Sequence, residues 1–301
     1  MASPLVFFVY NRADHCKQVI QALKDCTLAN ETDLYIFSDG PKNEKQTEKV
    51  NRVREYLAKI DKSYFKSVTV TQAPVNKGLA NSVIGAVGEI IRKYGRVIVI
   101  EDDSVPSANF LSYMNFCLDE YRNDSRVWAI GGYLIPFILP DDFKQDVFLS
   151  LRGSSCAWAT WSDRWELIDW DCKYYKGVKY NIFKRRDFNR AGKDLSLMLD
   201  RQMQHKIDSW AERFAFARYQ NNKYWVMPRI SKIYNIGFDN SGTHSGLTDR
   251  YSKVLLDQCD ENQSWAGASF YEEISRLLLK NYDMSLLSRA KVYIKTNYLH
   301  R

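Results

Sequence analysis

Three consecutive acids, Glu101, Asp102 and Asp103, directly follow a short aliphatic run at residues 97–100. Adjacent carboxylates repel one another, so we expect a cation among them. Mg²⁺ and Mn²⁺ prefer oxygen ligands and often bind through one or two carboxylates together with substrate phosphates. These acids therefore predict a metal site that faces a phosphate group. The alternative is that they are capping or solvated acids after an ordinary buried strand.

The aliphatic run is predicted to be the fourth strand of a region in which strands and helices alternate. Its continuous β-branched residues are typical of a strand covered on both faces. Such alternation favours a mostly parallel, doubly wound α/β sheet, in which ligands bind beyond the carboxyl ends of the strands. The other predicted elements of this region are strands at residues 4–10, 34–38 and 68–71 and helices at 14–24, 43–60 and one ending at 94.

Polar residues follow the other predicted strands as well. Asn11 and Arg12 follow the first strand, Asp39 the second, and Asn76 and Lys77 the third. Since parallel strand ends share one edge, we expect these residues to line one crevice with the acids. Arg12 and Lys77 can neutralise phosphate charge, whereas Asp39 and the Asn11 segment offer the acceptor and donors that a uracil ring needs. Each residue alone could equally shape its loop.

The second half of the chain is less regular. Trp158, Trp161 and Trp165 could stack on sugar rings, or at spacings of three and four they could form one buried helical stripe. We expect a mixture, with Trp158 nearest the site. The other elements predicted in this half are strands at residues 127–132, 148–151, 225–228 and 233–236 and helices at 110–121, 192–206, 208–221 and from about 269.

Composition narrows the class of protein. The net charge of +7 favours anionic partners such as nucleotide phosphates or an anionic membrane. Nucleic-acid binding is disfavoured, because the charge is dispersed and acids crowd the predicted crevice. The six cysteines show no CxxC spacing, which favours a reducing compartment and a cytoplasmic protein. No apolar stretch is long enough to span a bilayer.

Residues 4–12, 37–40, 76–81 and 97–103 together resemble the nucleotide-sugar half of a GT-A glycosyltransferase. They are most similar to bacterial enzymes related to N-acetylglucosaminyltransferase I, with Glu-Asp-Asp in place of the commoner Asp-X-Asp. The similarity continues through residues 158–161, 208–210, 228 and 235–238 to 243–244. It implies a Rossmann-like, mostly parallel central sheet with helices on both faces and acceptor-side helices towards the C-terminus.

The resemblance also implies a division of the chain and a set of ligands. Residues 1–104 would be the nucleotide-sugar half, 105–245 the acceptor and catalytic half, and 246–301 a helical extension. The donor would be a UDP-sugar whose diphosphate is bridged by Mn²⁺ or Mg²⁺. By motif position Asp103 would bind the metal, Glu101 and Asp102 would touch the ribose or metal-bound water, and Asp39 with the Asn11–Arg12 segment would hold the base.

His244 and two acids complete the predicted site. His244 follows a Gly/Asn/Ser-rich loop and could join the metal shell or donate to the diphosphate, or it could be an exposed loop histidine. Inverting transfer needs a carboxylate that takes the acceptor's hydroxyl proton, and the resemblance places it at Asp208. The alternative for Asp208 is helix capping. Glu212 is the fallback base, or it forms an ion pair with Arg213 or Lys206.

Two questions stay open from the sequence: what the C-terminal tail contacts, and which rival function the chain could have. The tail could lie on an anionic membrane that presents a lipid-linked saccharide acceptor, or it could be a terminal helix docked on the core. A sugar nucleotidyltransferase and a non-catalytic glycan- or nucleotide-binding module are the rival functions. Nucleotidyltransferases usually carry a Gly-rich basic loop after the first strand, which Asn11-Arg12-Ala13 is not. The tail's basic residues include Lys280, Arg289, Lys291, Lys295 and Arg301.

Overall fold

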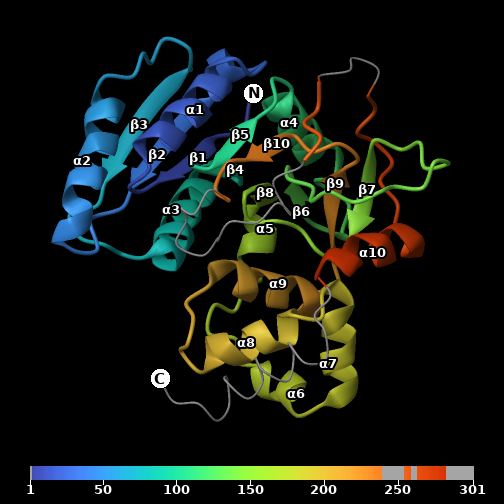
Figure 1. Cartoon of the computed structure of the whole chain (residues 1–301). Coiled ribbons are helices and arrows are strands. Elements are labelled where there is room, and N and C mark those ends of the chain that lie inside the picture. Colours follow the sequence, from blue (N-terminus) through green and yellow to red (C-terminus); the bar gives the residue numbers. More distant parts are fainter. Residues whose placement is uncertain (1, 239–253, 259–262, 283–301) are drawn as a thin grey trace.

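The computed structural model describes residues 2–238, 254–258 and 263–282. Figure 1 shows a sheet flanked by helices in the upper part and a smaller group of helices below it. His244 and the tail beyond residue 282 lie outside the described residues. Within the described residues, no helix has the length and apolarity needed to cross a membrane.

The central sheet has eight strands in the order β3-β2-β1-β4-β8-β6-β9-β7. The four strands β3, β2, β1 and β4 are mutually parallel. β8 runs antiparallel to β4 and β6, β9 is parallel to β6, and β7 is antiparallel to β9. The predicted mostly parallel α/β architecture is therefore confirmed. The strands are β1 (Leu5–Val9), β2 (Asp33–Ser38), β3 (Ser67–Gln72), β4 (Arg96–Glu101), β6 (Val127–Gly131), β7 (Val147–Ser150), β8 (Ala157–Trp161) and β9 (Tyr224–Pro228).

A second sheet pairs β5 (Ser104–Pro106) with β10 (Ile233–Asn235) in antiparallel register. It lies directly after the acids of β4, so it brings a late segment of the chain to the edge of the main sheet. The helices are α1 (Ala13–Lys24), α2 (Glu44–Ala58), α3 (Leu79–Tyr94), α4 (Phe110–Glu120), α5 (Ser162–Trp165), α6 (Tyr175–Lys179), α7 (Ile182–Phe188), α8 (Leu195–Met203), α9 (Trp210–Gln220) and α10 (Glu272–Leu279).

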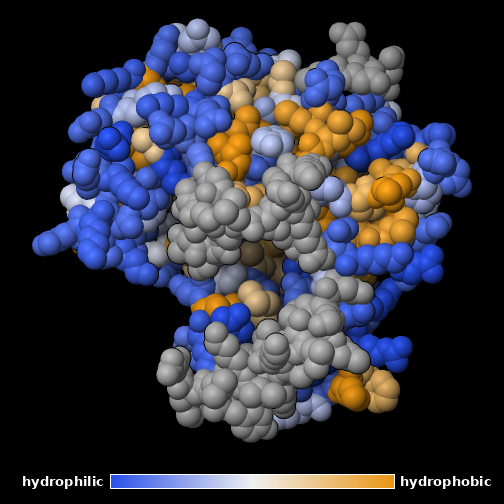
Figure 2. All heavy atoms as spheres, viewed as in Figure 1, coloured by the Kyte–Doolittle hydropathy of each residue, from blue (hydrophilic) through white to orange (hydrophobic). Residues whose placement is uncertain are grey.

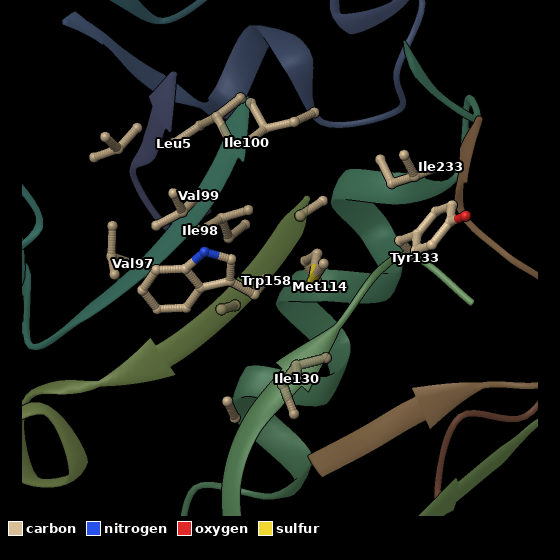
Figure 3. Packing of buried hydrophobic residues seen from close by; sticks show 14 of the residues in the cluster. Leu5, Val97, Ile98, Val99, Ile100, Met114, Ile130, Tyr133, Trp158 and Ile233 are labelled. Carbon is tan, nitrogen blue, oxygen red and sulfur yellow. The ribbon is translucent and has the colours of Figure 1, made fainter. Parts of the chain in front are cut away.

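Strand β4 lies in the centre of the main core. Residues 97–100 are at most 1% exposed, and Figure 3 shows them between Leu5 of β1 and Trp158 of β8. Burial of each such aliphatic side chain stabilises the fold by about 1.5–3 kcal/mol. Helix α3 delivers the chain to this strand and ends at Gly95, whose φ of 74° favours glycine. A firmly buried strand therefore holds the acids that follow it.

Strand β8 is one of the elements that the sequence pattern did not predict, and the others are β5, α5, α6 and α7. Trp158 and Trp161 lie on this strand and not on a helix, so the alternative of one buried helical stripe is wrong. Trp158 is fully buried, with its ring centroid 5.9 Å from that of Trp165 and 4.9 Å from that of Trp210. The ring of Trp158 packs inside the core, so the predicted contact of Trp158 with a sugar has no exposed surface to use.

A second, smaller core lies in what we call the helical lobe, residues 172–220. Helix α9 links the two cores, because its Trp210 and Phe214 belong to the main core and its Phe216 to the lobe. The two cores thus meet on opposite faces of one helix, which positions the lobe under the sheet (Figure 1). The lobe core contains Cys172, Tyr175, Val178, Phe188, Ala191, Leu195, Leu199 and Phe216.

The described part of the C-terminal segment packs on the main core. Ile274 and Leu278 of α10 are 2% exposed, and Phe270 forms an isolated bridge with Leu149 beside β7. Lys232 and Asp257 form an ion pair whose side chains are 2% and 1% exposed. The described residues of the predicted helical extension therefore contribute to the core of the preceding part of the chain.

Candidate functional site

Arg12 is the cation among the acids. Its Nη2 donates to Asp103 Oδ2 at 2.9 Å and also binds Asp102. Arg12 comes from the turn between β1 and α1, and the acids come from the end of the adjacent parallel strand β4. The backbone N–H of Tyr10 also donates to Asp102, at 3.4 Å. The predicted meeting of these strand ends is therefore observed for Arg12, Asp102 and Asp103.

Burial and mutual repulsion shift the protonation of this cluster. Burial raises the pKa of Glu101 well above its ordinary value, and the charges of Asp103 and Asp102 raise it further. Burial also raises the pKa of Asp102, although Arg12 opposes the shift. Burial would lower the pKa of Arg12, but the carboxylates of Asp102 and Asp103 outweigh it and raise that pKa. Arg12 alone does not neutralise the acids, so the cluster favours additional positive charge.

Backbone from β10 packs closely against Asp103. Asn235 Nδ2 lies 3.5 Å from Asp103 Oδ1, and the N–H of Ile236 donates to the Asp103 carbonyl at 2.8 Å. A Cβ atom at Gly237 would lie 2.3 Å from Asp103 Oδ2, so the close approach requires glycine. Residues 235–238, where the chain resembles GT-A glycosyltransferases, thus contact the acidic cluster through Asp103.

The carboxylate oxygens of this acidic cluster suit a hard cation only if a substrate phosphate supplies further ligands. In the parts of the chain that the structure describes, no group of three or more His, Cys, Asp or Glu residues forms a metal cage. Mg²⁺ and Mn²⁺ need only one or two protein carboxylates when substrate phosphates supply other ligands. The carboxylates of Asp103 and Glu101 fit that requirement, and Arg12 Nη1, buried and without a partner among the described residues, fits a phosphate oxygen.

Asp39 anchors the loop that follows β3. Its Oδ1 accepts from the N–H groups of Gly40 and Lys77 at 2.8 and 2.9 Å. Its Oδ2 accepts from Asn76 Nδ2 and the N–H of Gly78, both at 3.0 Å. A carboxylate has about four acceptor positions, so all are filled. Asp39 therefore shapes its loop, and a direct bond from Asp39 to a uracil ring, as predicted, would displace one of these donors.

Asn11 and Lys77 lie near the rim of the same edge. Asn11 Nδ2 donates to Gln46 Oε1 of α2 at 2.6 Å, and the side chain of Lys77 is exposed. The exposed cation of Lys77 extends from the loop that Asp39 anchors. Contact of Asn11 and Lys77 with a nucleotide stays a prediction.

A pocket of about 300 Å³ lies between α8, α9 and the loop after β7. Glu212 of α9 lines it and is 6% exposed, and its Oε1 has no hydrogen-bond partner in the described part of the chain. Burial raises the pKa of Glu212 to about 8, with Arg152 opposing the shift and Asp194 adding to it. Asp194 pairs with Arg152 through two hydrogen bonds of 2.6 and 2.9 Å.

Aromatic rings form part of the wall of this pocket. Trp210, Trp225 and Tyr282 line it together with Ser154 and Ser155. The ring centroid of Tyr282 lies 3.8 Å from the guanidinium carbon of Arg152. Aromatic faces beside hydroxyl and charged groups are a suitable lining for a polyhydroxyl ligand. The pocket thus combines an unpaired carboxyl group with surfaces that can hold a saccharide.

Asp208 lies in a different environment from Glu212. Its side chain is 57% exposed, and Arg213 Nη2 donates to its Oδ1 at 2.6 Å. The helix-capping role considered for Asp208 belongs to Ser209, whose Oγ accepts from the N–H of Glu212 at 3.2 Å. The geometry therefore favours Glu212, the predicted fallback, over Asp208 as a proton acceptor in an enclosed site.

One loop connects the pocket to the acids. Ser155 lines the pocket, and the next residue, Cys156, accepts from Glu101 N at 3.2 Å through its carbonyl oxygen. Asn235 Nδ2 also lies 3.3 Å from Cys156 Sγ. The loop that lines the pocket therefore continues to the backbone of the strand that carries the acids. The sequence had no signal for the Arg152–Asp194 pair, whose members are 42 residues apart.

No protein-family model and no curated protein matches the chain. The chain is similar to the crystal structure of TarS from S. aureus, with 11% identity over 78% of this chain and 36% of that chain and a TM-score of 0.45. For TarS 1–349 in complex with UDP, the identity is 12% over 77% of this chain and 60% of that chain, with a TM-score of 0.44. For the mannosyltransferase PcManGT from Pyrobaculum calidifontis in complex with GDP-Man and Mn²⁺, the identity is 12% over 54% and 45%, with a TM-score of 0.36. The chain therefore spans less than two thirds of each of these proteins.

Proposed function

We propose that this protein transfers a sugar from a nucleotide-sugar, with UDP as the predicted nucleotide, to a hydroxyl group of a saccharide or lipid-linked saccharide. The observation that carries the proposal is that one loop connects two unlike sites. An acidic cluster with a partly unpartnered arginine lies at the carboxyl edge of the sheet, and the loop that contacts its strand also lines a pocket with a buried carboxyl group whose Oε1 has no partner in the described structure. The first suits a diphosphate and the second suits an acceptor.

On the donor side, Arg12 would bind a phosphate oxygen through Nη1, while Asp102 holds its guanidinium in place. Asp103 and Glu101 would hold Mn²⁺ or Mg²⁺, and that ion, when bound, supplies charge neutralisation for the departing diphosphate. Lys77 and Asn11 would contact the nucleotide at the rim. The participation of His244 stays a prediction.

On the acceptor side, Glu212 would remove the hydroxyl proton as the hydroxyl attacks the anomeric carbon in a single displacement with inversion. A base works best when its pKa is near the operating pH, and the Glu212 value of about 8 meets that condition. Asp208 remains the alternative base. Transfer of an N-acetylhexosamine, as in the enzymes related to N-acetylglucosaminyltransferase I, and a cytoplasmic role in polysaccharide assembly are finer parts of the same proposal.

The test is release of nucleoside diphosphate from a panel of UDP- and GDP-sugars with Mn²⁺, measured for the wild type and for Asp103→Ala. We expect metal-dependent release by the wild type and its loss in Asp103→Ala. Asp14→Asn is the matched control, because the Asp14 side chain is 88% exposed on α1. Full activity of Asp103→Ala would remove the donor-site assignment. Binding without release would favour a non-catalytic module, and formation of nucleoside triphosphate and sugar 1-phosphate when pyrophosphate is added would favour a nucleotidyltransferase.

A further inference from the structure

The outer end of the helical lobe is strongly basic. Residues 173–186, which we call the lobe tip, contain six Lys and Arg residues and no acid. Arg185 is committed to the fold, since it binds buried Asp200 through two hydrogen bonds of 2.9 Å. The other basic residues of the lobe tip give it a local positive charge, and they are Lys173, Lys176, Lys179, Lys184 and Arg186.

Large apolar side chains stand among these charges. Tyr174, Tyr180, Ile182 and Phe183 are 73%, 77%, 75% and 80% exposed. Figure 2 shows a small hydrophobic patch on this part of the lobe, close to α7 in the view of Figure 1. Exposed apolar side chains that gather in one place, and are not scattered singly, indicate a contact surface.

The local structure holds this surface in place. Asn181 caps α7, and its Oδ1 accepts from the N–H groups of Phe183 and Lys184, both at 3.0 Å. The cap fixes Ile182 and Phe183 in the first turn of the helix, while Phe188 of the same helix is fully buried in the lobe core. The exposure of Ile182 and Phe183 is therefore a consequence of the fold.

We propose that the lobe tip docks on an anionic lipid bilayer. Ile182 and Phe183 would enter the boundary between headgroups and acyl chains, and Tyr174 and Tyr180 would lie at headgroup level. The lysines and Arg186 would contact anionic headgroups. Charge complementarity selects this partner, because a neutral protein surface would leave the basic residues uncompensated.

This inference goes beyond the proposed transfer reaction and does not depend on it. It also uses different residues from the predicted membrane contact of the tail. Helices α8 and α9 of the same lobe line the Glu212 pocket, so docking would bring that pocket towards the bilayer. A lipid-linked acceptor could then reach the pocket.

The experiment is co-sedimentation of the full chain with phosphatidylcholine vesicles and with vesicles that also contain phosphatidylglycerol. We expect binding to the anionic vesicles that weakens as salt is added. The double variant Ile182→Ser/Phe183→Ser should lower the vesicle affinity at least tenfold. The matched control is Ile138→Ser, because Ile138 is 89% exposed but lies outside the lobe.

Charge is tested separately. Lys173→Gln/Lys176→Gln should weaken binding to anionic vesicles severalfold, whereas Lys45→Gln/Lys49→Gln, the same charge change at exposed positions of α2, should not. Unaltered melting temperatures would show that each variant folds. Unchanged vesicle binding by Ile182→Ser/Phe183→Ser would overturn the proposal. If truncation after Tyr282 then abolished vesicle binding, the C-terminal tail and not the lobe tip would be the membrane contact. Preference for a single-stranded oligonucleotide over anionic vesicles would overturn it as well.

Discussion

Asp257 and Glu212 are both buried carboxyl groups, 3% and 6% exposed, but their surroundings differ. Asp257 accepts hydrogen bonds from Lys232, from Gln263 Nε2 at 2.8 Å and from Asn109 Nδ2 at 3.2 Å. Burial would raise its pKa, but these bonds outweigh burial and lower it. Glu212 has an oxygen without a partner in the described structure, and its pKa rises to about 8.

The comparison separates a structural carboxylate from a chemically available one. Burial penalises the charged form of both residues, so partners decide which form is stable. Asp257 stays ionised and joins the segment after residue 253 to α4 and β10. Glu212 has a pKa close to neutral pH, so both its forms are accessible and it can exchange a proton with a ligand in its pocket.

Glu212→Gln should reduce sugar transfer by about 10²–10⁴-fold, because it removes the proton acceptor and keeps the shape of the side chain. The measurement is the rate of nucleoside diphosphate release with the donor that the panel identifies. Asp208→Asn serves as the comparison and should lose less than about tenfold. If the two variants showed the opposite order, Asp208 would be the base and the contrast with Asp257 would have no catalytic meaning.

Lys232→Met should lower the free energy of unfolding by roughly 3–5 kcal/mol, because it leaves the buried Asp257 carboxylate without its cation. Urea denaturation measures this loss. The double variant Lys232→Met/Asp257→Leu should recover most of it, since replacing both charges with apolar groups is often close to neutral. A double variant as unstable as the single one would argue that Asp257 contributes more through Asn109 and Gln263 than through Lys232.

The pH dependence of stability should differ between the wild type and Glu212→Gln. The folded-state pKa of about 8 exceeds the ordinary value of 4.5, so the folded state keeps a proton that the unfolded state loses between these pH values. Wild-type stability relative to Glu212→Gln should therefore be highest below pH 4.5 and fall as pH rises towards about 8. The slope is at most about 1.4 kcal/mol per pH unit. Unfolding curves of both proteins across this range measure it, and parallel curves would contradict the raised pKa.

Asn109→Ala should cost about 1 kcal/mol of stability, because Asp257 loses one hydrogen bond but keeps its contacts with Lys232 and Gln263. Thermal denaturation measures this small effect. Ser107→Ala tests a neighbouring hydrogen bond that does not reach Asp257, namely the 2.9 Å bond to Asn109. A loss in Asn109→Ala as large as that of Lys232→Met would mean that the amide, not the ammonium, compensates Asp257.

Several features of the fold could be predicted because they depend on neighbours in sequence. The strand predicted at residues 34–38 is Asp33–Ser38, and the helix predicted at 14–24 is Ala13–Lys24. The acids of β4 were recognisable because a β-branched run ends in consecutive charges. Strand β8 could not be recognised in the same way, because its sequence Ala-Trp-Ala-Thr-Trp lacks a β-branched run. Its two tryptophans are three residues apart, a spacing that also fits one face of a helix.

Local periodicity and residue type are enough to predict the alternating strands and helices of the first half, the acidic end of β4 and the basic character of the lobe tip. Three other features depend on how the chain folds: Asp39 is saturated, Trp158 is buried, and Glu212 has an unpaired oxygen while Asp257 has none. The protonation and accessibility of a polar group depend on its partners and its burial, and residues distant in the chain supply both.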